Sequence, residues 1–157
     1  TYVINEMNVP VLCMGTKNIV VSASAEGILV SDIDRADSIK PYVDQIDQQI
    51  MYAEKSWGSY RVIDIEEESV TIKVTLNPGH SMNYHSHEHR DEVWTVLSGE
   101  GRTIVDGMEQ MVHAGDVITM SAGCRHTIIA GTELQVMEVQ LGKEINVHDK
   151  KVYALER

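Results

Sequence analysis

The most constraining feature of this sequence is a pair of histidines one residue apart, followed by a carboxylate, within a stretch that otherwise resembles β-strands. His85 and His87 are two positions apart, so on one strand their side chains point to the same face and can bind one ion. Glu92 has the wrong parity to join them along an unbroken strand. The polar run 88–91 is therefore expected to turn or bulge, so that Glu92 returns from the neighbouring strand. A fourth ligand is then needed, and His126 is the leading candidate.

Short strand-like segments dominate the chain from Trp57 onward. Asp106-Gly107, between two apolar runs, predicts a two-residue hairpin. The segments expected to be strands are 60–65, 70–76, 82–87, 92–98, 101–105, 108–113, 116–120, 126–129 and 134–141. Short strands at this spacing predict a β-sandwich or barrel.

The first part of the chain is expected to form a small β appendage. Three segments rich in Val and Ile predict short strands: Val9–Met14, Asn18–Ser22 and Gly27–Val30. The apolar period then changes to that of a helix from about Asp37 to about Glu54, with Pro41 near its start, where a missing N–H costs little. The residues that set this period are Ile39, Tyr42, Val43, Ile46 and Ile50. This helix is expected to link the appendage to the barrel.

Charge and cysteine content narrow the possible partners and the compartment. The net charge of −11 argues against nucleic acid or an anionic membrane as a partner. A phosphorylated sugar stays possible, because one metal and one or two arginines can bind a phosphate locally. Cys13 and Cys124 are far apart with no framework around them, which favours a reduced, cytoplasmic protein. No apolar run approaches the length of a membrane span, and Thr1 in place of Met indicates a processed piece or part of something longer.

One expected strand carries large apolar side chains on both faces. Trp94 and Val96 lie on one face, and Val93 and Leu97 lie on the other. A strand of this kind is usually covered on both sides, by the appendage or by a second subunit. We therefore expect a homodimer.

The four candidate ligands, three imidazoles and one carboxylate, suit a divalent metal ion and leave positions open for substrate oxygens. Zinc is the first expectation, and Mn, Fe, Co and Ni are alternatives. The competing interpretation is that the same residues are satisfied core polar groups in a barrel that holds no metal.

Two motifs resemble those of the cupin superfamily. They are Gly79-x5-His85-x-His87-x4-Glu92-x6-Gly99 and Gly115-x5-Ser121-Ala122-Gly123-x2-His126. In the second motif, serine stands where a proline is usual. The resemblance implies an all-β fold, the cupin double-stranded β-helix or jelly-roll barrel, here with a short N-terminal β appendage and one linker helix.

Further segments resemble the C-terminal type II mannose-6-phosphate isomerase domain of bifunctional guanylyltransferase/isomerase polypeptides. They are 55–62, Arg90-x-Glu92-x-Trp94 and Glu138-Val139-Gln140-x-Gly142. Residues 1–40 are similar to the tail of the nucleotidyltransferase in such polypeptides. This resemblance implies three parts: 1–40 as the nucleotidyltransferase remnant, 41–56 as a linker helix and 57–157 as the cupin domain. It also implies an upstream nucleotidyltransferase domain as a partner in the parent chain.

The resemblance implies a metal-dependent isomerase that interconverts mannose 6-phosphate and fructose 6-phosphate. Glu138 and His89 are then the candidate bases, and Arg90 is the candidate phosphate anchor. The chain departs from that family at three positions: His85 replaces a glutamine, Val93 a histidine and Thr127 an arginine. Two other functions stay open: a non-catalytic metal-binding cupin that regulates or assembles the transferase, and a different metal-dependent cupin enzyme, such as an oxygenase or another sugar isomerase.

Overall fold

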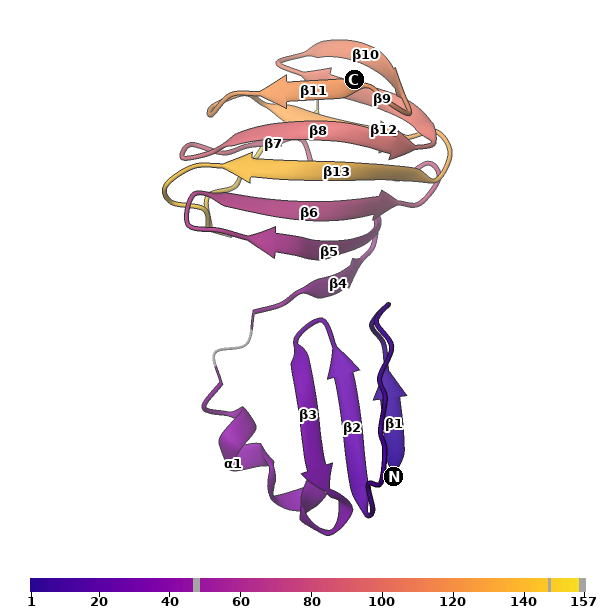
Figure 1. Ribbon diagram of the computed structural model, residues 1–157. Helices are drawn as coiled ribbons and strands as arrows, with labels where there is room; N and C mark the ends of the chain where they lie inside the picture. Colours follow the sequence, from indigo (N-terminus) through magenta and orange to yellow (C-terminus); the bar gives the residue numbers. More distant parts are fainter. Residues whose placement is uncertain (47–48, 147, 156–157) are drawn as a thin grey trace. The chain divides into compact units, whose positions relative to one another are not determined.

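The computed structural model describes residues 1–46, 49–146 and 148–155, and these fall into two compact units, Thr1–Met51 and Tyr52–Arg157 (Figure 1). Each unit is described by itself. Nearly all regular structure is β-strand, as the sequence predicts. Within the described residues, no helix has both the length and the apolar character needed to cross a membrane.

The first unit contains a three-stranded sheet in the order β1-β2-β3. Its strands are β1 (Tyr2–Asn5), β2 (Ile19–Ser24) and β3 (Gly27–Asp32). β2 and β3 form the expected antiparallel hairpin, whereas β1, which the sequence analysis missed, pairs with β2 in parallel.

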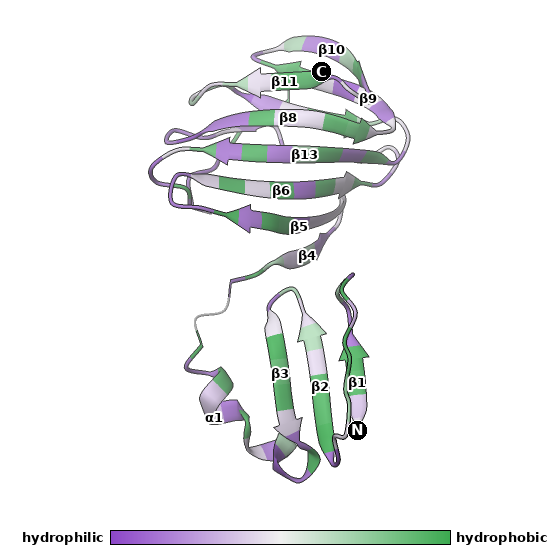
Figure 2. Cartoon of the chain, viewed as in Figure 1, coloured by the Kyte–Doolittle hydropathy of each residue, from purple (hydrophilic) through white to green (hydrophobic). Residues whose placement is uncertain are grey.

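The predicted strand at Val9–Met14 is wrong, because this segment belongs to the connection between the parallel strands β1 and β2. Its residues and side chains of β2 and β3 together line an apolar cavity of about 480 Å³. The segment therefore lies beside strands β2 and β3 without extending the sheet, and several of its apolar side chains stay exposed. Figure 2 shows the hydrophobic character of all three strands of this unit.

The predicted linker helix over 41–56 is also wrong in extent. The structure has a 3-10 helix at Ile33–Ser38 and then one short helix, α1 (Lys40–Val43), while Tyr52–Lys55 forms strand β4 of the second unit. Part of the predicted helix, residues 47–48, lies outside the described residues. The apolar face of the predicted helix is exposed, at 61% for Ile46 and 69% for Ile50. A short helix that packs its apolar face against nothing is marginal in water, whereas β4 gains backbone hydrogen bonds from its neighbouring strand.

The second unit is built from two sheets. The six-stranded sheet has the order β11-β8-β13-β6-β5-β4, and the five-stranded sheet the order β10-β9-β12-β7-β14. The six-stranded sheet also contains β5 (Gly58–Ile65), β6 (Ser69–Leu76), β8 (Asp91–Ser98), β11 (Val117–Met120) and β13 (Leu134–Leu141). The five-stranded sheet contains β7 (His85–Ser86), β9 (Glu100–Val105), β10 (Met108–His113), β12 (His126–Ala130) and β14 (Lys151–Val152).

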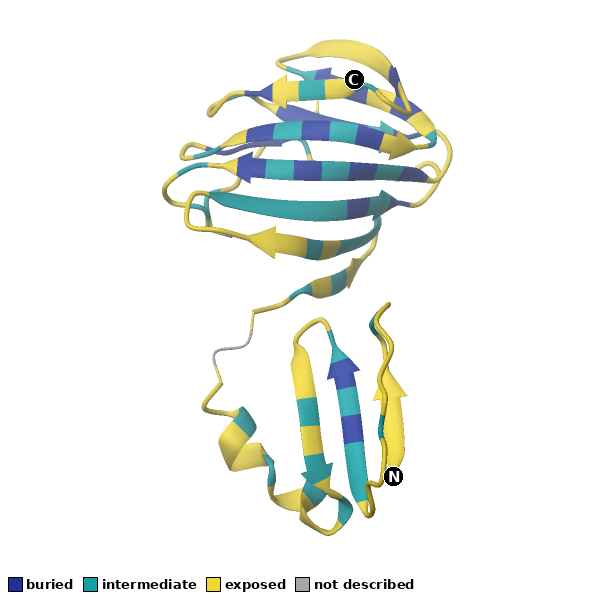
Figure 3. Ribbon diagram, in the orientation of Figure 1, coloured by how far each residue is buried: buried dark blue, intermediate teal, exposed yellow. Residues whose placement is uncertain are grey.

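Alternating burial along the strands produces the core of this unit. On β8 and β13 every second residue is buried, which is visible as dark bands in Figure 3. The buried apolar residues form one cluster between the sheets: Val74, Leu76, Trp94, Val96, Val112, Met120, Ile128, Ala130, Leu134 and Val136. The inward face of the same strands changes from apolar to polar towards Glu92 and Glu138, so the core leads directly into a polar interior site.

Most of the predicted barrel strands are confirmed within a residue or two. The Asp106-Gly107 hairpin is also confirmed: Val105 pairs with Met108, and both turn residues have positive φ angles of 47° and 82°. The main difference is the segment 82–87, where only His85–Ser86 pair as a strand. The short pairing is sufficient to place His85 opposite His126 on β12.

Candidate metal centre

The four residues predicted as ligands, His85, His87, Glu92 and His126, lie together in the interior of the second unit. One candidate ligand atom from each residue lies within 4.8 Å of the others, and all four residues are buried. The three histidines come from β7, the residue after it and β12, in the five-stranded sheet. Glu92 comes from β8 in the six-stranded sheet, so the polar turn at 88–90 crosses between the two sheets. The expectation that Glu92 returns from a neighbouring strand is therefore wrong, although the turn itself is present.

Backbone carbonyls determine which nitrogen of each imidazole faces the centre. The Nδ1 atoms of His85 and His126 lie 2.6 Å from the Asn83 carbonyl oxygen and 3.0 Å from that of Cys124, and His87 Nδ1 contacts the Asp149 carbonyl. A carbonyl oxygen only accepts, so each Nδ1–H donates, and in the neutral imidazole each Nε2 then carries the lone pair. This orientation by outer hydrogen bonds is typical of metal-binding histidines.

The Nε2 lone pairs point towards the carboxylate of Glu92. His87 Nε2 lies 3.1 Å from Glu92 Oε1, and His126 Nε2 lies 3.2 Å from Glu92 Oε2. His126 Nε2 is fully buried and has no hydrogen-bond partner among the described residues. A buried, unpaired acceptor is costly, and a cation shared with the carboxylate would satisfy it. The donor set and this unpaired nitrogen therefore fit a divalent metal ion.

The protonation states also suit a metal. Burial alone would raise the pKa of Glu92, but contacts with the imidazoles of His126 and His87 and the charge of Arg90 hold that pKa well below its usual range. Glu92 is therefore a carboxylate. Burial and the positive charge of Lys150 lower the pKa of His85 to about 3, so this imidazole is neutral at neutral pH. Metal ligands must be deprotonated, and these two groups meet that requirement.

The family comparison agrees with the fold and with this geometry. Residues 72–140, which include all four candidate ligands, match the family model described as "Cupin domain". Residues 72–140 form a cupin domain. Solved structures of the same fold include a double-stranded β-helix protein from Klebsiella pneumoniae, which has a TM-score of 0.54 and 21% identity and covers 60% of this chain and 83% of that one. An RmlC-like cupin from Shewanella frigidimarina has a TM-score of 0.52 and 20% identity, with coverages of 57% and 81%. Both show the fold alone.

Sequence relatives extend beyond the cupin domain. The mannose-1-phosphate guanylyltransferase ManC of Salmonella typhimurium is 26% identical over 148 residues, which cover 88% of this chain and 31% of the enzyme. The mannose-1-phosphate guanylyltransferase of Escherichia coli K12 is 25% identical with the same coverages. The alginate biosynthesis protein AlgA of Pseudomonas putida is 24% identical, covering 87% of this chain and 30% of the relative. This chain thus spans about a third of the length of these relatives, and its cupin domain is homologous to part of guanylyltransferase polypeptides.

Glu138, predicted as a base, lies in the interior of the cupin domain beside the four candidate ligands. It is on β13, where it pairs with Trp94, and the next inward residue, Gln140, pairs with Glu92. Gln140 Nε2 donates to Glu138 Oε1 over 2.6 Å. Burial and the negative charge of Glu92 raise the pKa of Glu138 to about 7. A carboxyl group with this pKa can both accept and release a proton near neutral pH.

The other two predicted catalytic residues lie differently. His89 is exposed in the turn before β8, and its backbone N–H donates to Asp149. Arg90 is close to the centre: its Nη2 lies 2.9 Å from Glu92 Oε1 and 3.0 Å from His87 Nε2. The guanidinium is thus engaged by the candidate ligands themselves.

The C-terminal segment completes the centre, and sequence reasoning missed it. Strand β14 pairs with β7, so that Lys151 lies opposite Ser86. The Asp149 carboxylate accepts the backbone N–H groups of Glu88 and His89 at 2.8 and 2.9 Å, which fixes the turn that carries Arg90 towards Glu92. The only sequence signal was a short polar run near the end of the chain, which resembles any solvated tail.

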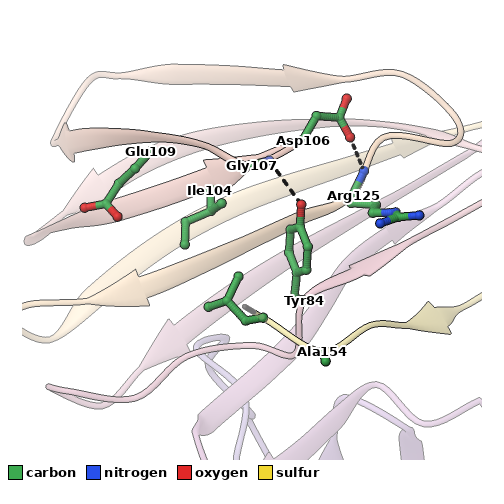
Figure 4. Close-up of a pocket in the computed structure, with 8 residues that line it drawn as sticks. Tyr84, Ile104, Asp106, Gly107, Glu109, Arg125 and Ala154 are labelled. Atoms are coloured by element: carbon green, nitrogen blue, oxygen red, sulfur yellow. Dashed lines mark hydrogen bonds between the residues drawn. The ribbon is translucent and has the colours of Figure 1, made fainter. Parts of the chain in front are cut away.

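A separate cavity of about 570 Å³ lies on the other side of the strands that carry the histidines (Figure 4). Tyr84 and Arg125 line it, and each directly precedes a histidine of the centre. Neighbours on a strand point to opposite faces, so these two side chains are directed away from the four candidate ligands. Tyr84 Oη accepts the Gly107 N–H at 3.1 Å, and the Arg125 guanidinium stacks 4.1 Å from the Tyr153 ring centre.

Proposed function

We propose that His85, His87, Glu92 and His126 hold a divalent metal ion, with zinc the first candidate and Mn, Fe, Co and Ni the alternatives. The observation that carries this proposal is the convergence of three oriented imidazoles on one buried carboxylate, with His126 Nε2 left without a partner. A carboxylate and three imidazoles are ordinary ligands for these metals.

We further propose that the domain is an aldose–ketose isomerase acting on mannose 6-phosphate and fructose 6-phosphate. The homology to mannose-1-phosphate guanylyltransferases supports a phosphorylated mannose as the substrate class. In this proposal residues 1–40 are the end of a nucleotidyltransferase region, and 57–157 are the cupin domain. A bound divalent cation would supply Lewis-acid stabilisation of negative charge on the substrate's oxygens.

Glu138 is the proton-transfer group in this proposal. Its carboxylate removes the proton from C2 of the aldose and returns it to C1, while the hydroxyl proton on O2 moves to O1, so that the sugar is isomerised with no net gain or loss of atoms. Its buried position beside Glu92 and its pKa of about 7 support this role. His89 is the weaker candidate because its side chain is exposed in the turn.

The test combines metal analysis with an isomerase assay. The purified protein, reconstituted with zinc, is expected to bind about one metal ion per chain and to interconvert the two hexose 6-phosphates. His126→Ala should lower metal affinity at least about tenfold and abolish turnover, because it removes one donor of the set. His113→Ala is the matched control, since that histidine is exposed on β10, with a side chain 64% accessible. If His126→Ala binds metal as well as His113→Ala does, the proposed centre is wrong.

A second candidate function is a non-catalytic metal-binding module of a guanylyltransferase. The observation that favours it is the engagement of Arg90 by Glu92 and His87, which leaves the predicted phosphate anchor occupied. This function predicts metal binding without isomerisation. Turnover of another substrate, with the same dependence on His126, would instead indicate a different metal-dependent cupin enzyme.

A further inference from the structure

The strand register places Lys150 on the same face as the candidate ligands. Val152 pairs with His85 across β14 and β7, and cross-strand partners in an antiparallel pair lie on the same face of a sheet. Lys150 directly precedes β14 and is two residues before Val152, so the alternation of the strand assigns this exposed residue to the face that carries His85. The next residue, Lys151, points the other way.

Contacts on the opposite face confirm this alternation. Lys151 Nζ lies 5.6 Å from the centre of the Tyr153 ring, and Tyr153 Oη lies 3.0 Å from the Ser86 hydroxyl. Lys151, Tyr153 and Ser86 therefore share the outer face. Two adjacent lysines are directed to opposite sides of one short strand pair, and only Lys150 is on the side of the metal centre.

Lys150 is the cation of this centre that is not engaged by a carboxylate. Arg90 is bound by Glu92, whereas Lys150 forms no ion pair in the part of the chain that the structure describes. Its ammonium is nevertheless within the electrostatic reach of the interior. Lys150 is exposed by its accessible surface, but the protein around its ammonium removes enough water to lower its pKa, and the charges of Glu138 and Glu92 act in the opposite direction.

We propose that Lys150 binds the phosphate group of the sugar phosphate and so selects phosphorylated over neutral sugars; this rests on the proposed function. A lysine ammonium is a compact donor that binds phosphate as a point charge. Because residues 149 and 150 are adjacent, the same segment that orients His87 through the Asp149 carbonyl delivers this charge to the site. The C-terminal segment thereby determines substrate specificity.

The experiment measures ligand binding to the full chain, with and without added zinc, by calorimetry. The probes are mannose 6-phosphate, unphosphorylated mannose and inorganic phosphate. Lys150→Met is expected to lower the affinity for mannose 6-phosphate and for inorganic phosphate by about tenfold to a hundredfold, which is the loss expected for one charged hydrogen bond. The affinity for unphosphorylated mannose should not change. Lys150→Arg should restore most of the affinity, because the charge is kept.

Lys151→Met is the matched control, since it removes the same charge one residue away on the outer face. Equal losses of phosphate affinity in the two methionine variants would show a general charge effect and would overturn the proposal. Unchanged phosphate binding in Lys150→Met, or no phosphate binding by the unaltered protein, would overturn it as well. A loss of phosphate affinity in Lys150→Met alone, with no isomerase turnover by the unaltered protein, would support the role of Lys150 and reject the isomerase. Failure of the Lys150 proposal and failure of the isomerase proposal are therefore distinguishable.

Discussion

The two units of this chain bury their apolar residues to very different extents. In Figure 3, strands β1 and β3 of the first unit are exposed or half-buried, whereas β8 and β13 of the second unit carry buried residues. In the first unit, the buried hydrophobic residues among those described are Val21 and Ala23. Leu12 is 81% exposed and Met14 is 78% exposed. In the barrel, ten buried hydrophobic residues form one continuous cluster.

This difference follows from how each sheet is covered. The inward side chains of each barrel sheet pack against the other sheet, so the period-2 pattern of the strands is matched by a second apolar surface. The three-stranded sheet has no second sheet against it within its own unit among the described residues; the segment Val9–Met14 lines a cavity with side chains of β2 and β3. Hydrophobic stabilisation scales with the apolar area removed from water, so the barrel contributes most of the stability of the described structure. The rigid support for the four candidate ligands comes from the same barrel.

The largest difference is expected between two equivalent substitutions, one in each unit. Leu76→Ala removes a fully buried side chain (0% exposed) and should cost about 2–5 kcal/mol of unfolding free energy. Leu12→Ala, at 81% exposed, should change it by less than about 0.5 kcal/mol. Denaturant titration followed by tryptophan fluorescence reports on the barrel, because Trp57 and Trp94 both lie there, and calorimetry reports on the whole chain. A similar cost at both positions would remove the contrast between the units.

The barrel strands and the grouping of the four candidate ligands were largely predictable from sequence, because the strands follow from local composition and the four residues from motif spacing. The strand-like composition of 92–98 and 134–141 predicts strands that the structure confirms as β8 and β13. The two-residue spacing of His85 and His87 predicts a shared face. These signals are strong because a one-residue shift would expose every buried side chain of a strand.

The predictions failed where a local pattern did not determine its packing partner. The helical period of Ile39 to Ile50 is real, but Ile46 and Ile50 stay largely exposed, and Tyr52–Lys55 pairs with β5 instead. The contribution of Asp149 and Lys150 was invisible for a different reason. It depends on a two-residue pairing between β14 and β7, which are more than sixty positions apart, and so short a strand leaves no periodic signal. The predicted homodimer stays a prediction; Leu97, on the outer face of β8, is 41% exposed.

A second expected difference is a pH dependence that originates in the barrel. The pKa of Glu138 is raised from 4.5 to about 7, by burial first and then by the charge of Glu92. The folded state therefore binds more protons than the unfolded state between these two values, so this group's contribution to stability is present below pH 4.5 and is lost as pH rises through about 7. The total change is up to about 3 kcal/mol.

Glu138→Gln removes this titration without removing the side chain's volume. The stability of the unaltered protein minus that of Glu138→Gln, measured in metal-free buffer by denaturant titration, should fall between about pH 5 and about pH 8. Glu109→Gln is the control, since Glu109 is an exposed partner of Arg102, with its side chain 50% accessible. A flat difference curve for Glu138→Gln would show that its carboxyl group titrates at an ordinary pKa.

The smallest expected difference concerns two glycines in equivalent backbone conformations. Gly15, in the first unit, and Gly99, between β8 and β9, both have positive φ, at 65° and 84°. An alanine at either position has the same strain of the left-handed region, about 1–2 kcal/mol. At Gly15 the added methyl group meets nothing within 4 Å, but at Gly99 it would lie 2.0 Å from the carbonyl oxygen of Glu133, which directly precedes β13.

The backbone before β13 must therefore move to admit an alanine at Gly99, and such overpacking adds about 1–3 kcal/mol. Gly99→Ala is thus expected to lower the midpoint of denaturant unfolding more than Gly15→Ala does. Because β13 carries Glu138, Gly99→Ala should also weaken the proposed isomerase turnover. Equal costs at the two glycines would mean that the barrel turn yields as readily as the open loop at Gly15, and that close packing does not extend to the edge of the barrel.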